Sequence, residues 1–324
     1  MIKDPCLVAD IGGTNVRFAL AEPGSATISE IMSLRCADFA GPREAVQAYL
    51  EKCSLPSGTL KRAAFAVATA VTGDAIQLTN GAWSFDRKQL AHALGIDRLT
   101  VSNDFEALAL ALPRLTLEDF RPIGTLRPTN TLPMIAIGPG TGLGVAGVIP
   151  TRHGWVAAPG EGGHATLAAA DDFESEILQA ARRETGHVSA ERLLSGIGLP
   201  LLLRAVCAVQ GTPSIDLPAE EISHLGVTDQ NPQCHTTMEL FFALLGSFAG
   251  NVALTFGARG GVFIGGGIVP KLQDFLAVSR FRERFEAKGR FQPYLEKIAT
   301  VTITAPYPAL HGLAYALAVS DDNR

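Results

Sequence analysis

The chain lacks any run of basic residues, and its formal net charge is −5 over 324 residues. Proteins that bind nucleic acid or an anionic membrane carry clustered lysine and arginine, so we expect neither kind of partner. Charged residues make up only 18% of the sequence, whereas hydrophobic residues make up 47%. This composition excludes a disordered chain and is typical of a well-buried globular protein.

Cysteine is also scarce, because only five occur and none belongs to a C-x-x-C pair. An odd number of scattered cysteines fits the thiols of a reducing compartment better than a disulfide framework. The first residues, M-I-K-D-P-C, provide no apolar segment of the length found in a signal peptide. We therefore expect a cytoplasmic protein.

The sequence has no uninterrupted apolar stretch of membrane-spanning length. Its longest apolar stretch, Leu240 to Ala258, is interrupted by Ser247, Asn251 and Thr255, which lie four residues apart and so share one helix face. A buried helix of a soluble protein is favoured over a membrane span. Two glycines four residues apart within this stretch predict close packing against another helix. The same helix could instead pack against a second copy of the chain, which makes a homodimer one hypothesis.

Strand and helix patterns alternate along the first third of the chain. A predicted hairpin at 7–20 is followed by predicted strands at 28–34, 62–71 and 99–102, and by helices that start at Pro42, end at Gly95 and break at Pro113. This order predicts an α/β domain with a mixed sheet flanked by helices.

The segment Arg114 to Pro133 is rich in proline, threonine and charge, so it predicts a domain boundary. Beyond it, M-I-A-I-G-P-G-T-G-L-G-V-A-G-V-I repeats the order of strand, glycine turn and strand. Helices are predicted at 173–184, 191–210, 238–258, 270–277 and 310–319, with strands at 262–264 and 301–304. Duplication of one unit of three strands, helix, strand and helix would produce both halves.

The first hairpin encloses a polar turn, Gly12-Gly13-Thr14-Asn15, and carries Asp10 at its mouth. Adjacent glycines allow the backbone to turn sharply and bring its N–H groups close to a ligand. A carboxylate beside such donors can hold a cation or its water shell. From these residues alone, an ordinary turn and a nucleotide-phosphate site remain equally open.

The second glycine-rich turn alternates Gly138, Gly140, Gly142 and Gly144 with other residues. Part of it matches a dinucleotide fingerprint, but that fingerprint requires a following helix, and V-A-G-V-I-P predicts a strand. A P-loop is absent, because no Gly-Lys-[Ser/Thr] occurs. We therefore expect the two hairpins to face each other across a cleft and offer N–H groups to one ATP, with Thr141 adding a hydroxyl donor.

Asn103 and Asp104 stand where a buried strand passes into a helix. Either residue at such a junction is a good helix N-cap, which is the simpler interpretation. The carboxyl edge of a sheet is also where α/β proteins bind ligands. There a carboxylate can accept the proton of an alcohol, and Asn103 could orient the same alcohol.

A second polar group, Glu161 and His164, lies in the glycine loop P-G-E-G-G-H. Side chains of this kind suit the hydroxyls of a sugar, and a solvated loop is the alternative. No cysteine lies near, and His153 and His164 lack zinc-ligand spacing. Glu191 is by itself only an acid in the first turn of a predicted helix, where the helix dipole favours it.

Taken together, these residues resemble a known family. The segments D-I-G-G-T-N, V-S-N-D-F, G-P-G-T-G-L-G, P-G-E-G-G-H, A-E-R-L-L-S-G and G-G-V-F-I-G-G-G-I-V-P-K-L occur in the order and spacing seen in bacterial ATP-dependent glucokinases. These enzymes belong to the hexokinase–actin–heat-shock-protein ATPase superfamily, and the resemblance runs from about residue 7 to residue 315.

The resemblance implies a fold and a reaction. The fold would be the two-lobed actin-like ATPase fold, related to ribonuclease H, with mixed sheets flanked by helices and a central cleft that closes on sugar. We expect a small α/β domain of residues 1–113 plus 305–324 and a large α/β domain of residues 114–304. The reaction would be phosphoryl transfer from MgATP to the 6-hydroxyl of D-glucose.

The resemblance also implies roles for individual residues. Asp104 would be the catalytic base, and Asn103, Glu161, His164 and Glu191 would bind the other sugar hydroxyls. Asp10 would lie near Mg²⁺ and hold it through water. The nucleotide would be bound by Ala9, Asp10, Ile11, Gly12, Gly13, Thr14 and Asn15, by Gly140, Thr141 and Gly142, and by Gly265 and Gly266 beside the adenosine.

One departure separates the chain from the related group of repressors and kinases. That group carries a cysteine-rich zinc motif after its E-x-G-H loop, whereas no cysteine follows His164 before Cys207. Only six residues precede Leu7, which leaves no room for the helix-turn-helix of a repressor. The motifs leave three alternatives open. The chain could be a kinase of fructose, mannose or an N-acetyl sugar, it could use another phosphoryl donor such as ADP or polyphosphate, or it could be a sugar sensor without catalysis.

Overall fold

The computed structural model describes residues 4–56, 58–79, 81 and 83–322. The chain divides into two compact units: unit 1 comprises Met1–Arg114, Pro150–Pro159 and Pro306–Arg324, and unit 2 comprises Leu115–Ile149 and Gly160–Ala305. The expected large domain, 114–304, includes residues 150–159, whereas the contacts place them in unit 1. The ends of the expected small domain, residues 1–3 and 323–324, lie outside the described residues.

Unit 1 is built on a five-stranded sheet of order β3-β2-β1-β4-β7. Its strands are β1 (Cys6–Ile11), β2 (Asn15–Ala21), β3 (Ile28–Arg35), β4 (Arg62–Val67) and β7 (Arg98–Asn103). The first three form an antiparallel meander, whereas β4 and β7 run parallel to β1. Ile11 pairs with Val67, which in turn pairs with Asn103, so the carboxyl ends of these three strands meet at one edge.

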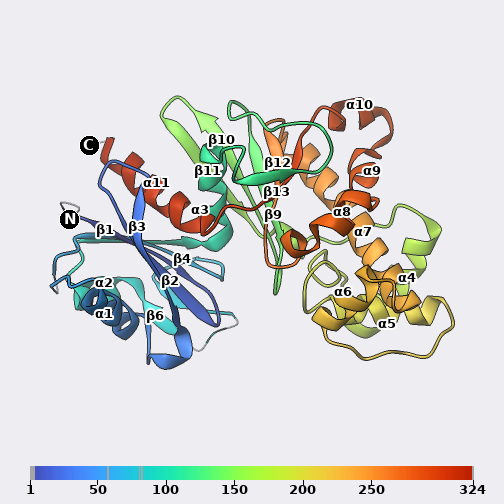
Figure 1. Ribbon diagram of the computed structural model, residues 1–324, viewed down its shortest axis with the longest axis horizontal. Coiled ribbons are helices and arrows are strands. Elements are labelled where there is room, and N and C mark those ends of the chain that lie inside the picture. The colour runs from blue at the N-terminus through green and yellow to red at the C-terminus, as the bar shows by residue number, and fades with distance from the viewer. Residues whose placement is uncertain (1–3, 57, 80, 82, 323–324) are drawn as a thin grey trace. The chain divides into compact units, whose positions relative to one another are not determined.

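Helices cover both faces of this sheet, as Figure 1 shows. One face packs against α1 (Pro42–Lys52) and α2 (Arg87–Leu94), and the other packs against α3 (Asp104–Ala111) and α11 (Pro308–Asp322). The approach of α11 to α3 requires Gly312, because a Cβ there would overlap the carbonyl oxygen of Ala107. A small hairpin, β5 (Ala75–Gln77) and β6 (Ser84–Asp86), completes the unit.

A six-stranded sheet of order β11-β10-β9-β12-β13-β8 has most of its strands in unit 2, whereas β11 falls almost entirely within the Pro150–Pro159 segment of unit 1. Its strands are β8 (Phe120–Pro122), β9 (Met134–Pro139), β10 (Leu143–Thr151), β11 (Gly154–Gly160), β12 (Gly261–Ile264) and β13 (Thr300–Ile303). Strand β10 is antiparallel to β9, whereas β12 and β13 run parallel to β9. Strand β8 pairs antiparallel with β13 at the edge of the sheet. Apart from β8, this is the strand order of unit 1, as the duplication hypothesis predicts.

One long helix organises the core of unit 2. Helix α7 (Pro232–Phe256) packs against α5 (Leu199–Val209), α6 (Ala219–Val227) and α9 (Phe281–Glu286). By length and composition α7 could cross a membrane, but 67% of its most apolar window is buried inside the unit. The expectation of a buried helix is therefore confirmed, and these buried apolar residues give no support to a homodimer interface. The remaining helices are α4 (Asp172–Thr185), α8 (Gln273–Val278) and α10 (Gln292–Leu295).

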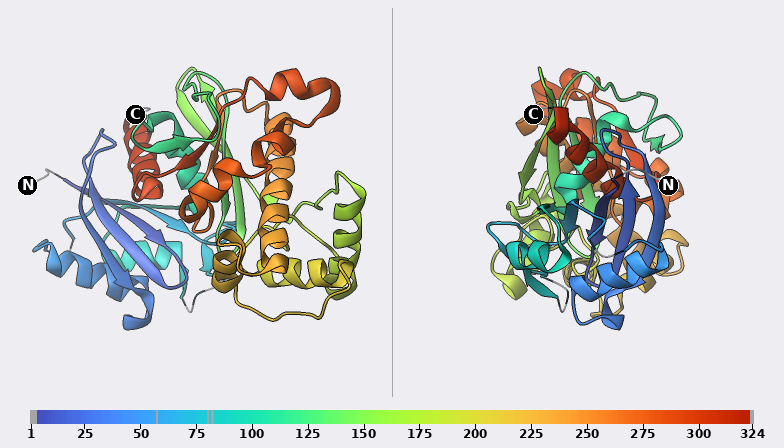
Figure 2. Two further views of the ribbon diagram at one scale, coloured as in Figure 1. Left: turned by 45° about the vertical axis from the view of Figure 1, so that its right-hand side comes forward. Right: turned by 90° about the vertical axis from the view of Figure 1, so that its left-hand side faces the viewer.

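Helix α9 lies beside α7 (Figure 2). This contact depends on Gly246 and Gly250, the two glycines for which close packing was predicted. A Cβ on Gly246 would overlap the carbonyl oxygen of Phe281, and one on Gly250 would do the same at Phe285. On the same contact Arg284, only 5% exposed, lies 2.6 Å from the buried carboxylate of Glu174 and donates to Ser247 Oγ over 3.1 Å. The close-packing prediction for this glycine pair is therefore confirmed.

Several predicted element boundaries were wrong. Strand β4 ends at Val67 rather than at residue 71, and α7 begins at Pro232 rather than at residue 238. The helix predicted at 191–210 begins only at Leu199, because residues 191–198 form a series of turns. At 270–277, a 3₁₀ turn occupies Val269–Leu272 before α8 starts. The elements β5, β6, β8, β11, α6, α9 and α10 were not predicted.

Replacement of Gly246 by alanine tests the α7–α9 contact. The added methyl group must push α9 away, so we expect the free energy of unfolding to fall by about 1–3 kcal/mol or more. Thermal denaturation measures the change. Asn251→Ala, at an exposed position of the same helix, is the control and should stay within about 0.5 kcal/mol of the parent. Equal stability of the Gly246 variant and the control would contradict the packing account.

Candidate active site

The first glycine turn joins β1 to β2 and carries backbone donors that can serve a ligand. The turn is closed by one internal hydrogen bond, from the N–H of Gly12 to the carbonyl of Asn15 at 2.9 Å. Within the described residues, the next two N–H groups, of Gly13 and Thr14, donate to no acceptor. Successive free N–H groups in a turn form a concave anion-binding surface. The turn therefore has the chemistry of a phosphate site.

Cys36 holds this turn from behind. Its backbone N–H donates to the carbonyl of Thr14 at 2.8 Å, and its thiol lies 3.5 Å from the carbonyl oxygen of Gly12. The carbonyl of a trans peptide points opposite to the N–H of the next residue, so the Gly12 carbonyl directed toward Cys36 leaves the N–H of Gly13 pointing the other way. No motif in the sequence identified Cys36, because it lies 24 residues from Gly12 and the contact depends on the pairing of β3 with β2.

Strand alternation separates the roles of the residues just before the turn. Ala9 and Ile11 are fully buried in the core beneath α1 and α2, so their side chains are not available to a ligand. Asp10 points to the opposite face, where its Oδ2 lies 3.2 Å from Nη1 of Arg17. Burial raises the pKa of the Asp10 carboxyl above its ordinary value, against the opposing effect of Arg17.

Arg17 was missed by the sequence reasoning, although the hairpin predicts it. A turn centred on residues 12–15 places residue 10 opposite residue 17, and the observed register pairs Asp10 with Arg17. Directly opposed residues of opposite charge interact across an antiparallel pair. The carboxylate therefore carries a partial counterion before any ligand binds.

Asn103 and Asp104 lie at the same sheet edge as the first turn. Asn103 ends β7, two strands from β1, which corresponds to about 10 Å. Its side chain caps α3 by accepting the N–H of Phe105 at 2.9 Å, and its amide donates to the carbonyl of Thr69 at 3.2 Å. The N-cap is therefore Asn103, while the half-buried Asp104 occupies the first turn of the helix.

The second glycine turn, between β9 and β10, repeats the design of the first. Gly140 donates to the carbonyl of Gly142 at 2.8 Å, and within the described residues the N–H groups of Thr141 and Gly142 have no acceptor. The carbonyl of Gly140 accepts the N–H of Gly196 at 2.8 Å. The exposed side chain of Thr141 stands at the tip of the turn. The two turns therefore resemble each other both in the order of the strands around them and in the N–H groups that, among the described residues, have no acceptor.

Gly265 and Gly266 follow β12 and pack against this second turn. Gly265 donates to the carbonyl of Ile137 at 2.8 Å. Gly266 has a φ of +79°, and a Cβ there would overlap the carbonyl oxygen of Pro139. Glycine is therefore required at this position both for its conformation and for the close approach.

Three of the predicted sugar ligands lie together in unit 2. His164 Nε2 is 3.8 Å from Glu161 Oε2, and His164 Nδ1 is 3.8 Å from Glu191 Oε1. The side chains of Glu161 and His164 are 59% and 62% exposed, so both are accessible to a ligand. Separations longer than a hydrogen bond leave these groups free to bind hydroxyls.

Glu191 reaches this cluster from a turn, so the prediction that it opens a helix was wrong. Its N–H donates to the carbonyl of Gly163 at 2.8 Å, which fixes the turn 191–198 to the loop that carries His164. Its Oε2 accepts the N–H of Leu143 at 2.8 Å. The helix dipole therefore does not explain the position of this acid, whereas the two loop contacts do.

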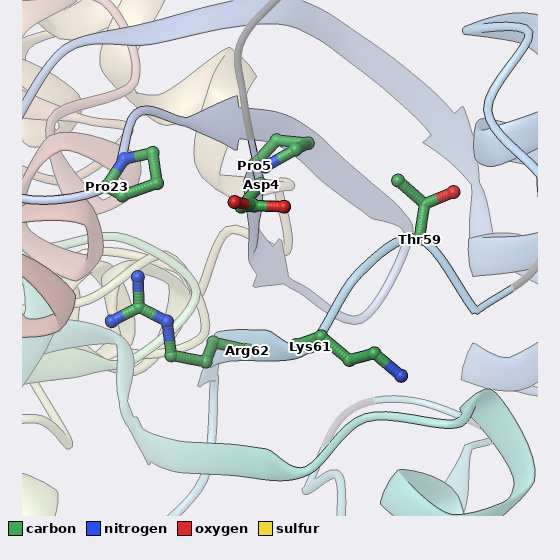
Figure 3. Close-up of a pocket in the computed structure, with 6 residues that line it drawn as sticks. All are labelled: Asp4, Pro5, Pro23, Thr59, Lys61 and Arg62. Carbon is green, nitrogen blue, oxygen red and sulfur yellow. The ribbon is translucent and has the colours of Figure 1, made fainter.

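Unit 1 also contains a pocket of about 410 Å³ (Figure 3). It is lined by Asp4, Pro5, Pro23, Thr59, Lys61 and Arg62. These residues adjoin the amino ends of β1 and β4, whereas the glycine turn and Asp104 lie at the carboxyl ends. Ligands of α/β sheets bind at the carboxyl ends, so this pocket is not part of the candidate site.

Comparisons with known proteins agree with the resemblance drawn from the motifs. The glucokinase of Paramagnetospirillum magneticum is 46% identical over 312 residues, which cover 95% of this chain and 96% of that protein. The glucokinase of Aromatoleum aromaticum is 48% identical over 313 residues, or 97% of this chain and 94% of that protein. The crystal structure of a glucokinase from an Antarctic psychrotroph superimposes with a TM-score of 0.88 at 37% identity, covering 97% of this chain and 98% of that one.

The match to the family is equally extensive. The family model described as Glucokinase matches residues 7–320, which include both glycine turns, Asp104, the Glu161–His164 loop and Glu191. The observed fold, with two mixed sheets flanked by helices, is that of the structurally similar glucokinase. The chain belongs to the glucokinase family.

Proposed function

We propose that the free N–H groups of the two glycine turns bind phosphate oxygens of ATP and that Asp104 activates the 6-hydroxyl of glucose. The activity of the family is phosphorylation of glucose by ATP, which yields glucose 6-phosphate and ADP. The observation that carries our assignment is that, across the described part of the chain, two N–H groups in each turn have no acceptor, those of Gly13 and Thr14 in one and of Thr141 and Gly142 in the other. Phosphoryl transfer requires mainly positioning and charge stabilisation, which preorganised N–H groups supply.

Asp104 is the residue that we assign as the general base. A carboxylate can take the hydroxyl proton while the oxygen attacks the γ-phosphorus. Its place in the first turn of α3 fixes the backbone beneath it, because Asn103 and Asp104 both accept the N–H of Phe105 at 2.9 Å. Asn103 retains an amide hydrogen and a lone pair beyond its two bonds, with which it can orient the same sugar.

Glu161, His164 and Glu191 are the ligands that we assign to the remaining sugar hydroxyls. Two carboxylates accept hydrogen bonds from hydroxyl groups, and the histidine ring between them can donate or accept. A site with several such partners discriminates strongly against sugars that lack a hydroxyl, because the unmatched polar groups would stay unpaired.

The residues of the first turn fit a magnesium ion held through water. Mg²⁺ usually keeps several waters and binds one or two carboxylates together with substrate phosphates. Within the described residues no group of three metal-binding side chains occurs, whereas Asp10 supplies one carboxylate beside a phosphate-type turn. Bound there, the ion would neutralise phosphate charge. Asp10 would hold its water shell, and Arg17 would keep the carboxylate oriented.

We also propose a cytoplasmic location. Cys36, Cys53, Cys207 and Cys234 are free thiols, and all of these except Cys53 are buried in the cores of the two units. Buried unpaired thiols fit a reducing compartment, in which disulfides are rare.

Replacement of Asp104 tests the base assignment. We expect Asp104→Ala to lower kcat by at least 100-fold while glucose still binds, because general-base catalysis contributes about 10²- to 10⁴-fold. Glu106→Gln is the matched control, since Glu106 is a second carboxyl in the same helical turn whose pKa burial raises. An ADP-release assay with calorimetric glucose binding separates the two properties. Near-normal turnover of the Asp104 variant, or a large loss in the Glu106 variant, would contradict the assignment.

The variant Asp10→Asn separates the effect of the buried carboxylate on stability from its proposed role in turnover. Because burial raises the pKa of Asp10, the folded state binds its proton more tightly than the unfolded chain, and the ionised group lowers stability at neutral pH. We therefore expect Asp10→Asn to melt at the same temperature as the parent or higher at pH 7. As the pH falls into the acid range, the parent should gain stability relative to the variant.

The same variant should lose most of its turnover, because it lacks the charge that would hold the magnesium water shell. Melting curves at several pH values and ADP-release rates measure the two effects. A variant that is less stable at pH 7 yet fully active would contradict both expectations.

A panel of sugars and donors tests the substrate assignment. With ATP we expect phosphorylation of glucose at a kcat/KM well above that of fructose, mannose and N-acetylglucosamine, and with ADP or polyphosphate we expect little product. Product formation is followed by phosphorus NMR, which detects any sugar phosphate directly. Saturable glucose binding without product for any donor would instead identify a sugar sensor. A preference for another hexose would overturn the substrate and leave the phosphate assignment intact.

A further inference from the structure

The two oxygens of the Glu191 carboxylate have different partners. Oε2 accepts the N–H of Leu143, the residue that follows the second glycine turn, at 2.8 Å. Oε1 lies 3.8 Å from Nδ1 of His164. One side chain therefore contacts both the hairpin that we assign to phosphate and the cluster that we assign to sugar.

The fit of this carboxylate against the hairpin is tight. A Cβ on Gly142 would overlap Glu191 Oε2, so the absence of a side chain at residue 142 makes room for the acid. The carboxylate is the least exposed member of its cluster, with 23% of the side chain exposed against 62% for His164. A charge-assisted hydrogen bond in such a setting is among the stronger ones in proteins.

The backbone around Glu191 is fixed from three directions. Its N–H donates to the carbonyl of Gly163, and its carbonyl accepts the hydroxyl of the buried Ser195 at 2.7 Å. Five residues after Glu191, the N–H of Gly196 donates to the carbonyl of Gly140 at 2.8 Å. Turn 191–198 thus fastens the glycine hairpin at one end and the His164 loop at the other.

We propose that Glu191 is a positioning residue for the nucleotide turn and that it couples glucose binding to nucleotide binding. The proposal rests on the proposed function, which assigns sugar to His164 and Glu191 and phosphate to the turn. Sugar hydroxyls at Oε1 hold the carboxylate in the one orientation in which Oε2 accepts the N–H of Leu143. That bond keeps Thr141 and Gly142 in the geometry that presents their free N–H groups. By linkage, the nucleotide favours the same orientation of Glu191 and so favours sugar.

Binary affinities measured on the full chain test this coupling. Calorimetric titration with MgADP in the absence of sugar should show about tenfold weaker binding for Glu191→Ala, the loss expected for one charge-assisted hydrogen bond. Glu191→Gln keeps an oxygen that can accept from Leu143, so its MgADP affinity should stay within about twofold of the parent. Both variants should bind glucose more weakly in the absence of nucleotide. His164→Ala should weaken glucose binding and leave MgADP binding unchanged.

Gly142→Ala provides the reciprocal measurement, because the added methyl group displaces the Glu191 carboxylate. We expect this variant, altered in the nucleotide turn, to bind glucose several-fold more weakly in the absence of nucleotide. Thermal denaturation confirms that each variant is folded.

Unchanged MgADP affinity in Glu191→Ala, with glucose affinity lost, would overturn the positioning role and leave the sugar site standing. Equal loss of MgADP affinity in the alanine and glutamine variants would overturn the role of the Leu143 bond. Unchanged glucose affinity in both Glu191→Ala and His164→Ala would overturn the sugar assignment itself, and the coupling with it.

Discussion

Each glycine turn is closed by an internal hydrogen bond, and the next two N–H groups have no acceptor among the residues that the structure describes. Backbone donors that stay unpaired in a folded protein carry a free-energy cost unless water or a ligand satisfies them. Such a pair of donors occurs in both units, at Gly13 and Thr14 and at Thr141 and Gly142, where the turns are at least partly open to water. Two adjacent N–H donors suit an anion with several oxygens, such as a phosphate group. The other residues of the candidate site are placed around these donors.

The sheets explain how the turns come to be placed in this way. The strand before each turn, β1 in unit 1 and β9 in unit 2, is central in its sheet, with its antiparallel hairpin partner on one side and a parallel strand on the other. The hairpin turn therefore stands at the carboxyl edge, beside the ends of the parallel strands. In unit 1 that edge also receives Asp104, and in unit 2 it receives Gly265 and Gly266. Carbonyls on the back of each turn are engaged, by Cys36 in one unit and by Gly196 in the other.

Local patterns in the sequence predicted the elements whose residues interact mainly with their neighbours along the chain. The hairpins, the helix that ends at Gly95, the buried α7 and its close-packing glycines all follow from short-range periodicity and turn residues. The opposition of Asp10 and Arg17 was also within reach, because it follows from hairpin register. The family resemblance supplied the roles of Asp104 and Glu191, which neither residue shows by itself.

Contacts between distant segments could not be predicted in this way. Residues 191–198 have the apolar spacing of a helix, yet they form turns because their backbone groups bind Gly163 and Gly140. Glu191 and Leu143 are 48 residues apart in the sequence, so no local sequence pattern predicts their hydrogen bond. Cys36 behind the first turn and Glu174 beside Arg284 are of the same kind. Tertiary contacts override local propensity where backbone groups find better partners far along the chain.

The most direct test of the account is an NMR measurement of the backbone amides. Addition of glucose and a non-hydrolysable MgATP analogue should move the amide proton signals of Gly13, Thr14, Thr141 and Gly142 downfield and slow their exchange with water, because charged phosphate oxygens replace water as acceptors. The amides of Gly12 and Gly140, already bonded within the turns, should move less. Saturating nucleotide that leaves the four signals in place while perturbing other amides would contradict the central claim.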